Sequence, residues 1–137
     1  MAVTEQLTEL GRRIAERENE IKGLRGKIET LNSLKEKLQK AKVECEYMQN
    51  DNLRFVRNIE NEDDNLGAVY IYCEEQHGYL KGGIYMASII ACEDMMHRID
   101  EKVDWYESEI HGLYASISRM NSEMDIVRLQ MQDMEGI

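Results

Sequence analysis

A heptad repeat runs through MHRIDEKVDWYESEIHGLYASISRMNSEMDIVRLQMQDM, residues 96–134. Its apolar residues recur at alternating spacings of three and four: Met96, Ile99, Val103, Tyr106, Ile110, Leu113, Ile117, Met120, Met124, Val127, Met131 and Met134. Tyr85, Ile89 and Cys92 continue the same spacing upstream. An average spacing of about 3.5 residues is typical of a left-handed coiled coil, in which a narrow apolar seam faces another helix. We therefore predict one long helix over residues 84–134, roughly 75 Å in length at about 1.5 Å per residue.

The first half of the chain carries a weaker repeat of the same kind. One seam is formed by Leu7, Leu10, Ile14, Ile21, Leu24, Ile28 and Leu31, with Arg17 interrupting it. The apolar pattern then moves to Leu34, Leu38, Ala41, Cys45 and Met48. This change predicts a three-residue phase slip that overwinds the supercoil locally. Because the chain has no proline, the residue that most surely breaks a helix, we predict a first long helix over residues 4–58.

Residues 59–83 form a connector of different composition. Residues 58–65 are polar and acidic, whereas residues 68–73, AVYIYC, fit either a short strand or a short buried helix. The helix is favoured because the surrounding sequence offers no partner strand. Residues 77–83, HGYLKGG, are interpreted as a loop, with Gly82 and Gly83 as its turn.

These elements predict an all-α fold with a single domain over residues 1–137. Its two arms are expected to form an elongated antiparallel helical hairpin with a coiled-coil seam, and one continuous rod is the alternative geometry. A single seam leaves other apolar residues only partly covered: Leu34, Ile90, Met95, Ile126 and Leu129. We therefore expect the hairpin to dimerise or to complete a helical bundle with a partner.

The distribution of charge excludes some classes of function. The formal net charge is −10, with net +2 over residues 1–58 and net −12 over residues 59–137. This acidity disfavours nucleic acid as a partner, because phosphates are bound by clustered Lys and Arg. No stretch of about 18 apolar residues is present, so no stable membrane insertion is expected, and the first ten residues do not resemble a signal peptide. Three cysteines without a CxxC pair favour a cytoplasmic protein.

Residues with catalytic chemistry are few. Cys73 and His77 are four residues apart, but a four-coordinate zinc site normally draws paired ligands from two segments, and a second pair is missing. We therefore predict no catalytic residues, no metal and no cofactor, and we do not expect an enzyme. Cys92 lies on the seam and is interpreted as a structural thiol. Cys45 and Cys92 lie at similar heights in a hairpin, and a bridge between them requires Cα atoms within about 7 Å.

The second arm also supplies the residues that we expect to bind a partner. They are Trp105, Tyr106, Ile110, Leu113, Ile117, Met120, Met124, Val127 and Met131. Methionines adapt to varied partner surfaces, although the same residues also serve to fill a core. Trp105 lies at the edge of the seam, where it is either an interface anchor or a residue packed within the hairpin.

The order of a helix of about 50 residues, a polar connector, a glycine turn and a second long helix resembles the WXG-type, Esx-like helical hairpins of type VII secretion. More closely, it resembles the WXG-like companion proteins of LXG polymorphic toxins. The resemblance implies an adaptor that binds the helical N-terminal domain of a toxin, in the cytoplasm or through export with it. The signature Trp-x-Gly is absent, because the corresponding segment reads Tyr79-Leu80-Lys81-Gly82. A self-associating coiled-coil scaffold is the alternative function.

Overall fold

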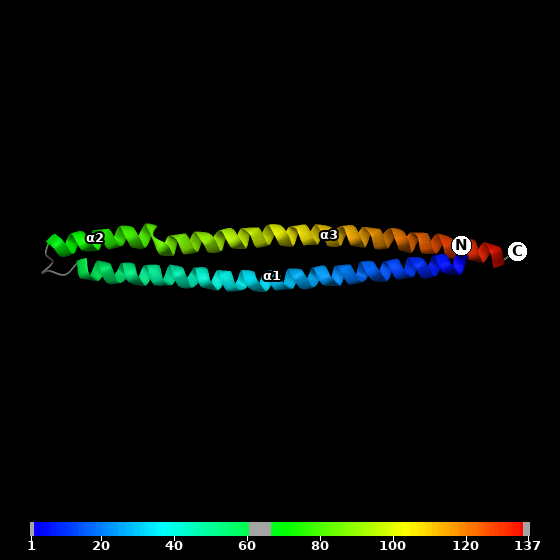
Figure 1. Cartoon of the computed structure of the whole chain (residues 1–137), viewed down its shortest axis with the longest axis horizontal. Coiled ribbons are helices and arrows are strands. Elements are labelled where there is room, and N and C mark those ends of the chain that lie inside the picture. The colour runs from blue at the N-terminus through cyan, green and yellow to red at the C-terminus, as the bar shows by residue number, and fades with distance from the viewer. Residues whose placement is uncertain (1, 61–66, 136–137) are drawn as a thin grey trace. The chain divides into compact units, whose positions relative to one another are not determined.

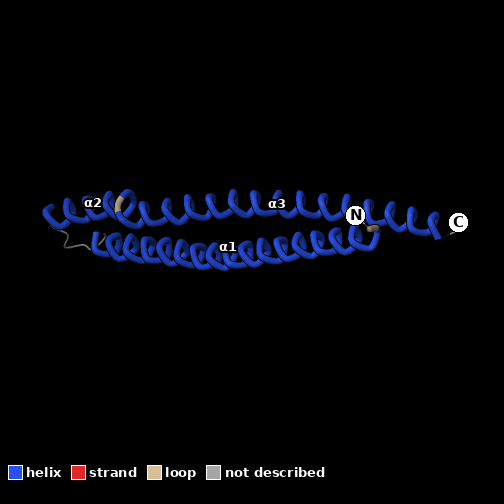
Figure 2. Tube along the Cα trace, turned by 45° about the vertical axis from the view of Figure 1, so that its right-hand side comes forward, coloured by secondary structure: helices blue, strands red, loops and turns tan. Residues whose placement is uncertain are grey.

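The protein consists of three helices in the computed structural model, which describes residues 2–60 and 67–135. Helix α1 spans Val3–Glu60, α2 spans Gly67–Gly82 and α3 spans Ile84–Glu135 (Figure 1). The described residues contain no strand (Figure 2). The predicted all-α helical hairpin is confirmed, and α1 and α3 extend one or two residues beyond the predicted ranges 4–58 and 84–134.

The chain divides into two compact units, whereas the sequence predicts one domain. Unit 1 comprises Met1–Leu31 and Glu101–Ile137, and unit 2 comprises Asn32–Asp100. Within each unit a part of α1 packs antiparallel to a part of α3, and unit 2 also contains α2, which lies beside the C-terminal end of α1 in both views (Figures 1 and 2).

The core of unit 1 is the predicted seam. Leu10 and Ile21 of α1 and Ile110 and Met120 of α3 are buried. The other seam residues are half-buried: Leu7, Ile14, Arg17, Leu24, Ile28, Leu31, Val103, Tyr106, Leu113, Ile117, Met124, Val127 and Met131. Only Met134, at the end of the repeat, is exposed. The heptad prediction for the second arm is therefore confirmed in this unit.

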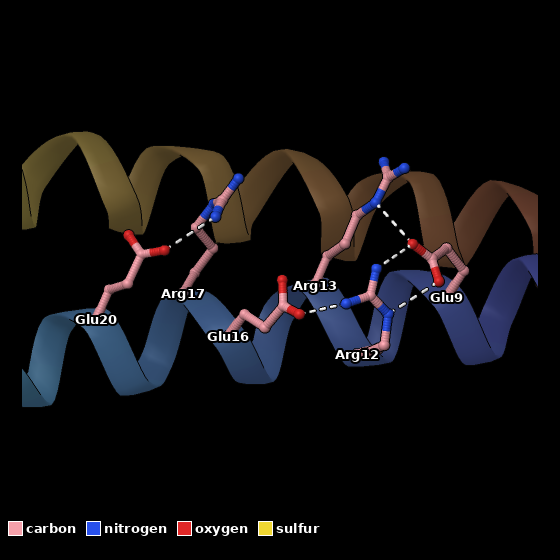
Figure 3. Close-up of polar contacts among 6 residues, drawn as sticks. All are labelled: Glu9, Arg12, Arg13, Glu16, Arg17 and Glu20. Atoms are coloured by element: carbon pink, nitrogen blue, oxygen red, sulfur yellow. Dashed lines mark hydrogen bonds and ion pairs between the residues drawn. The ribbon is translucent and has the colours of Figure 1, made fainter.

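Ion pairs between residues three or four apart follow one another along α1 in unit 1. They join Glu9, Arg12, Arg13, Glu16, Arg17 and Glu20 (Figure 3). Arg12 lies between Glu9, at 2.6 Å, and Glu16. The hydrogen bond from Arg12 lowers the pKa of Glu9. Residues three and four apart face each other on a helix, so these contacts support α1 locally.

In unit 2 the predicted phase slip after Leu31 is wrong. Leu34 and Met48 are 42% and 55% exposed, and Ala41 is also exposed. Lys35, Leu38, Lys42, Cys45 and Gln49 are half-buried instead, and they continue the heptad of the first 31 residues as far as position 49. Beyond it Asn52 is exposed and Leu53 is buried. The core residues of this unit are Leu53, Cys73, Ile89, Met96 and Ile99.

Lysine takes these seam positions because α3 offers carboxylates to its ammonium groups. The Nζ of Lys35 lies 2.6 Å from Oδ1 of Asp100, and the Nζ of Lys42 lies 3.1 Å from Oε1 of Glu93. The aliphatic stem of a lysine covers apolar surface while its charged end reaches toward the edge of the seam. The helix therefore keeps one register, although its most apolar side chains lie elsewhere.

The interpretation of residues 77–83 as a loop is also wrong. Helix α2 continues through Gly78 to Gly82, and the described chain only bends at Gly83 before α3 begins. No described glycine has a positive φ. Gly82 and Gly83 therefore do not form the hairpin turn, and α1 and α2 are already antiparallel (Figure 1). The polar residues 61–65 of the predicted connector lie outside the described residues, whereas the helix favoured for residues 68–73 is confirmed.

The bend requires glycine at position 83. A Cβ atom there would overlap the carbonyl oxygen of Tyr79, whereas a Cβ at Gly78 or Gly82 would meet nothing within 4 Å. The tight approach of the α2 backbone therefore explains why a glycine occupies this position.

Candidate partner-binding surface

The seam of unit 2 has one charged side. The Nζ of Lys42 lies between Glu46 of α1, at 3.8 Å, and Glu93 of α3, at 3.1 Å. These two glutamates therefore lie on the same side of the seam, and Asp100, seven residues after Glu93, continues their row. The hydrogen bond to Glu93 raises the pKa of Lys42. We call this side the charged flank.

The opposite side of the same seam is apolar. On α1 it is formed by the residues that immediately precede the seam positions 35, 42, 49 and 56, namely Leu34, Ala41, Met48 and Phe55. They are spaced by seven, so they form one row along the helix. On α3 the equivalent position is Met95, which precedes the buried Met96. We call these five residues the apolar flank.

The apolar flank is open to solvent. Phe55 is 65% exposed and Met95 is 47% exposed, in addition to the exposed Leu34, Ala41 and Met48. Single exposed apolar residues are common, but an ordered row of them is typical of an interaction site. Flanking positions of a coiled coil usually carry charged residues that select the partner. Here the row is uncharged over four heptads.

Charged residues border the apolar flank on α1. Lys37, Glu44 and Asp51 each follow a flank residue by three positions and are exposed. An apolar centre with a polar rim is the usual composition of a protein–protein interface.

The corresponding row of α1 in unit 1 carries polar and charged residues, namely Gln6, Arg13, Glu20 and Lys27. A groove of about 470 Å³ is lined there by Gln6, Arg13, Glu123 and Gln130 together with the exposed Ile126, over the floor residues Leu10 and Val127. In a second groove the ammonium groups of Lys27 and Lys102 lie 5.6 and 5.1 Å from the centre of the Tyr106 ring. Of the two sides compared, only that of unit 2 has an uninterrupted apolar row.

All nine predicted partner-binding residues lie in unit 1, and eight of them are buried or half-buried on the seam between α1 and α3. Ile110 and Met120 are buried between α1 and α3. Half-buried on the same seam are Tyr106, Leu113, Ile117, Met124, Val127 and Met131. Trp105 alone is exposed, at 52%, with its ring 5.3 Å from that of Tyr106 and 4.4 Å from the Nζ of Lys102.

The sequence prediction missed Met48 and Phe55 as surface residues. The expected phase slip places Met48 on the seam, and the sequence prediction gives Phe55 no role. An unbroken heptad continued from Leu31 places both at the flanking position, so the spacing of seven between residues 34, 41, 48 and 55 is the signal that identifies them.

The described residues contain no group of three His, Cys, Asp or Glu side chains arranged to hold a metal ion. Cys73 is buried and His77 is half-buried on α2. A search of the described helices for a membrane span finds none with the necessary length and apolar character. Comparison with known protein families, with curated proteins and with solved structures finds no match to this chain.

Proposed function

We propose that this protein is a non-catalytic helical adaptor that binds an amphipathic helix of another protein along the apolar flank. The observation that carries the proposal is the exposed row of Leu34, Ala41, Met48 and Phe55 beside Met95. A partner helix laid on this row adds a further helix beside α1 and α3 in unit 2 and covers the exposed side chains of the apolar flank. Recognition by an apolar helix face lying in a groove is a common mode of peptide binding.

The partner in this proposal is the helical N-terminal domain of a secreted LXG-type toxin. The order of helices along the chain, which resembles that of WXG-like companion proteins, supports this choice. In this role the adaptor meets the toxin in the cytoplasm and presents it to a type VII secretion machinery. The partner domain then supplies the helices that complete a bundle with the hairpin.

The size of the apolar flank implies that most of it must be used at once. Full burial of a Leu, Met or Phe side chain contributes roughly 1.5–3 kcal/mol, and the flank residues are already partly covered. Association costs at least about 4 kcal/mol in lost translational and rotational freedom. Contact with a single flank residue is therefore insufficient, and an aligned helix that spans several heptads is required.

The test is a binding measurement with the helical domain of a toxin encoded beside this chain, using the double variant Met48→Glu, Phe55→Glu. We expect the wild type to form a stoichiometric complex and the variant to lose at least about tenfold in affinity, because two carboxylates are then brought against an apolar helix. The matched control is Tyr47→Glu with Ile90→Glu, two exposed residues outside the flank. Circular dichroism checks that both variants keep their helix content. Equal binding by the flank variant and the control would contradict the proposal.

Self-association as a scaffold is the second candidate, and the lack of charge on the apolar flank favours it. Two copies, each with net charge −10, approach with least repulsion where the surface is uncharged. Light scattering distinguishes the two functions. An isolated chain at 16.0 kDa leaves the flank free for a toxin domain. If the wild type is a stable dimer and the Met48→Glu, Phe55→Glu variant is a monomer, the apolar flank binds a second copy instead.

A further inference from the structure

Cys45 of α1 and Cys92 of α3 occupy facing positions on the seam of unit 2. The register follows from a contact one heptad away, where Nδ2 of Asn52 donates a hydrogen bond of 2.9 Å to the hydroxyl of Tyr85. Cys45 lies seven residues before Asn52, and Cys92 lies seven residues after Tyr85. Because the two helices are antiparallel, a step of seven back along α1 matches a step of seven forward along α3. The two cysteines therefore lie at the same height.

The ion pairs on the other side of the cysteines give a register within about two residues of this one. Lys42 contacts Glu93 and Lys35 contacts Asp100, and these pairs are again separated by seven residues on each helix. The Lys42–Glu93 contact lies within one helical turn of Cys45 and adjacent to Cys92. Contacts on both sides of the cysteine pair thus place Cys45 within about two residues of the height of Cys92.

The spacing of packed helices suits a bond between these positions. Helix axes in contact are about 8–10 Å apart and the Cα atoms lie about 2.3 Å from each axis, so residues that face each other directly have Cα atoms roughly 3.4–5.4 Å apart. A disulfide requires a Cα separation of about 4.4–6.8 Å. Cys45 and Cys92 are free thiols in this structure, and both are half-buried on the inner side of their helices.

We propose that Cys45 and Cys92 form a reversible intramolecular disulfide that joins α1 to α3 when the protein meets a low-molecular-weight disulfide such as oxidised glutathione. The thiolate of one cysteine attacks a sulfur of the oxidant, forms a mixed disulfide and releases one glutathione thiolate. The second cysteine thiolate attacks the protein sulfur of that mixed disulfide and releases the second glutathione. The two protein thiols lose two protons and two electrons in total, and one oxidant disulfide is reduced to two thiols.

Cys73 is excluded from this chemistry by its position. It is 2% exposed on α2 and is not part of the facing pair. The bond between positions 45 and 92 closes a long segment of chain, and such a closure restricts the unfolded state more than the folded one. The disulfide therefore resists separation of α1 from α3 in unit 2. This property does not depend on the identity of any partner.

The experiment compares reduced protein with protein equilibrated in oxidised glutathione and then freed of reagent. We expect one of the three thiols to remain in the oxidised wild type and none in the Cys73→Ser variant. Peptide mapping by mass spectrometry is expected to show a cross-linked pair of peptides containing Cys45 and Cys92, with no glutathione attached. The thermal midpoint of the oxidised form is expected to rise by at least about 5 °C and to return on reduction.

Two further variants keep the test decisive. Cys45→Ser and Cys92→Ser are each expected to retain the helix content, to form no intramolecular bond and to show no rise in the thermal midpoint. Stable glutathione adducts on both Cys45 and Cys92 in the wild type would overturn the proposal, because facing thiols resolve such adducts. Bonds between molecules at low protein concentration, or a bond that includes Cys73, would overturn it as well.

Discussion

Lys42 shows how one side chain holds two helices in register. Its stem occupies a seam position, and its ammonium group contacts Glu46 of its own helix and Glu93 of α3. Removing it leaves two carboxylates on the charged flank without their shared cation. A polar residue at a seam position lowers the apolar content of the interface but selects one alignment of the two helices.

The stability that Lys42 contributes is expected to depend on alkaline pH. The hydrogen bond to Glu93 raises the folded-state pKa of Lys42 above its ordinary value of 10.5. A raised pKa means that the contribution is fully present below pH 10.5 and is lost as the pH rises through the folded-state value. Thermal unfolding of the wild type and of Lys42→Met, at neutral pH and above pH 11, measures this contribution. We expect the thermal midpoint of the variant to rise relative to that of the wild type at the higher pH. An unchanged difference would show that the ion pair is not formed in solution.

At the scale of the elements, the bend between α2 and α3 depends on one missing side chain. Glycine within a continuous helix lowers stability, yet at position 83 the carbonyl of Tyr79 leaves no room for a Cβ. The bend separates two helices that both pack against α1 in unit 2. It therefore adjusts which residues of α2, such as the buried Cys73, face α1.

Two glycine substitutions are expected to have opposite effects. Gly83→Ala destabilises the protein by about 1–3 kcal/mol, because the backbone has to shift to remove the overlap with Tyr79. Gly112→Ala, within α3 and with nothing within 4 Å of an added Cβ, stabilises it by up to about 1 kcal/mol through helix propensity. Urea unfolding measures both. If Gly83→Ala were as stabilising as Gly112→Ala, the bend would not be a property of the folded protein.

At the scale of the whole molecule, a strongly acidic chain carries one uncharged row, the apolar flank. The chain carries a net charge of −10, but the five residues of the apolar flank carry none. Charge at this level opposes non-specific association of copies, whereas an uncharged row permits contact at one place. Under the proposed function, the net charge opposes non-specific association, and the apolar flank of unit 2 is the surface that binds the partner.

Binding through the apolar flank is expected to be insensitive to salt. At about 1 M salt the Debye length falls to about 3 Å, so interactions between exposed charges are screened while apolar burial is retained. We expect the dissociation constant of the partner complex to change by less than about tenfold between low salt and about 1 M salt. Titration calorimetry at the two salt concentrations measures this. A steep loss of affinity at high salt would show that the charged residues bordering the flank, and not the flank itself, bind the partner.

The sequence alone predicts the all-α fold class and the main seam, because both follow from the residue pattern of a single helix. The absence of proline and the spacing of three and four from Met96 to Met131 need no knowledge of the rest of the chain, and the burial of these residues agrees with them. The partial exposure of Met95 is also a prediction of the sequence, since one seam cannot cover two apolar faces. These parts of the candidate site followed from local periodicity.

Only the tertiary structure showed which residues face inward in the second part of α1. Two registers compete for the seam: one buries Leu34 and Met48, and the other places Lys35 and Lys42 there. The second is adopted because the lysines meet carboxylates of α3, about 50 residues or more further along the chain. A pattern counted on one helix favours the apolar register, because it does not include the charges of the helix opposite. The structure also shows helix where the sequence predicts a loop at residues 77–83, and it exposes Met48 and Phe55.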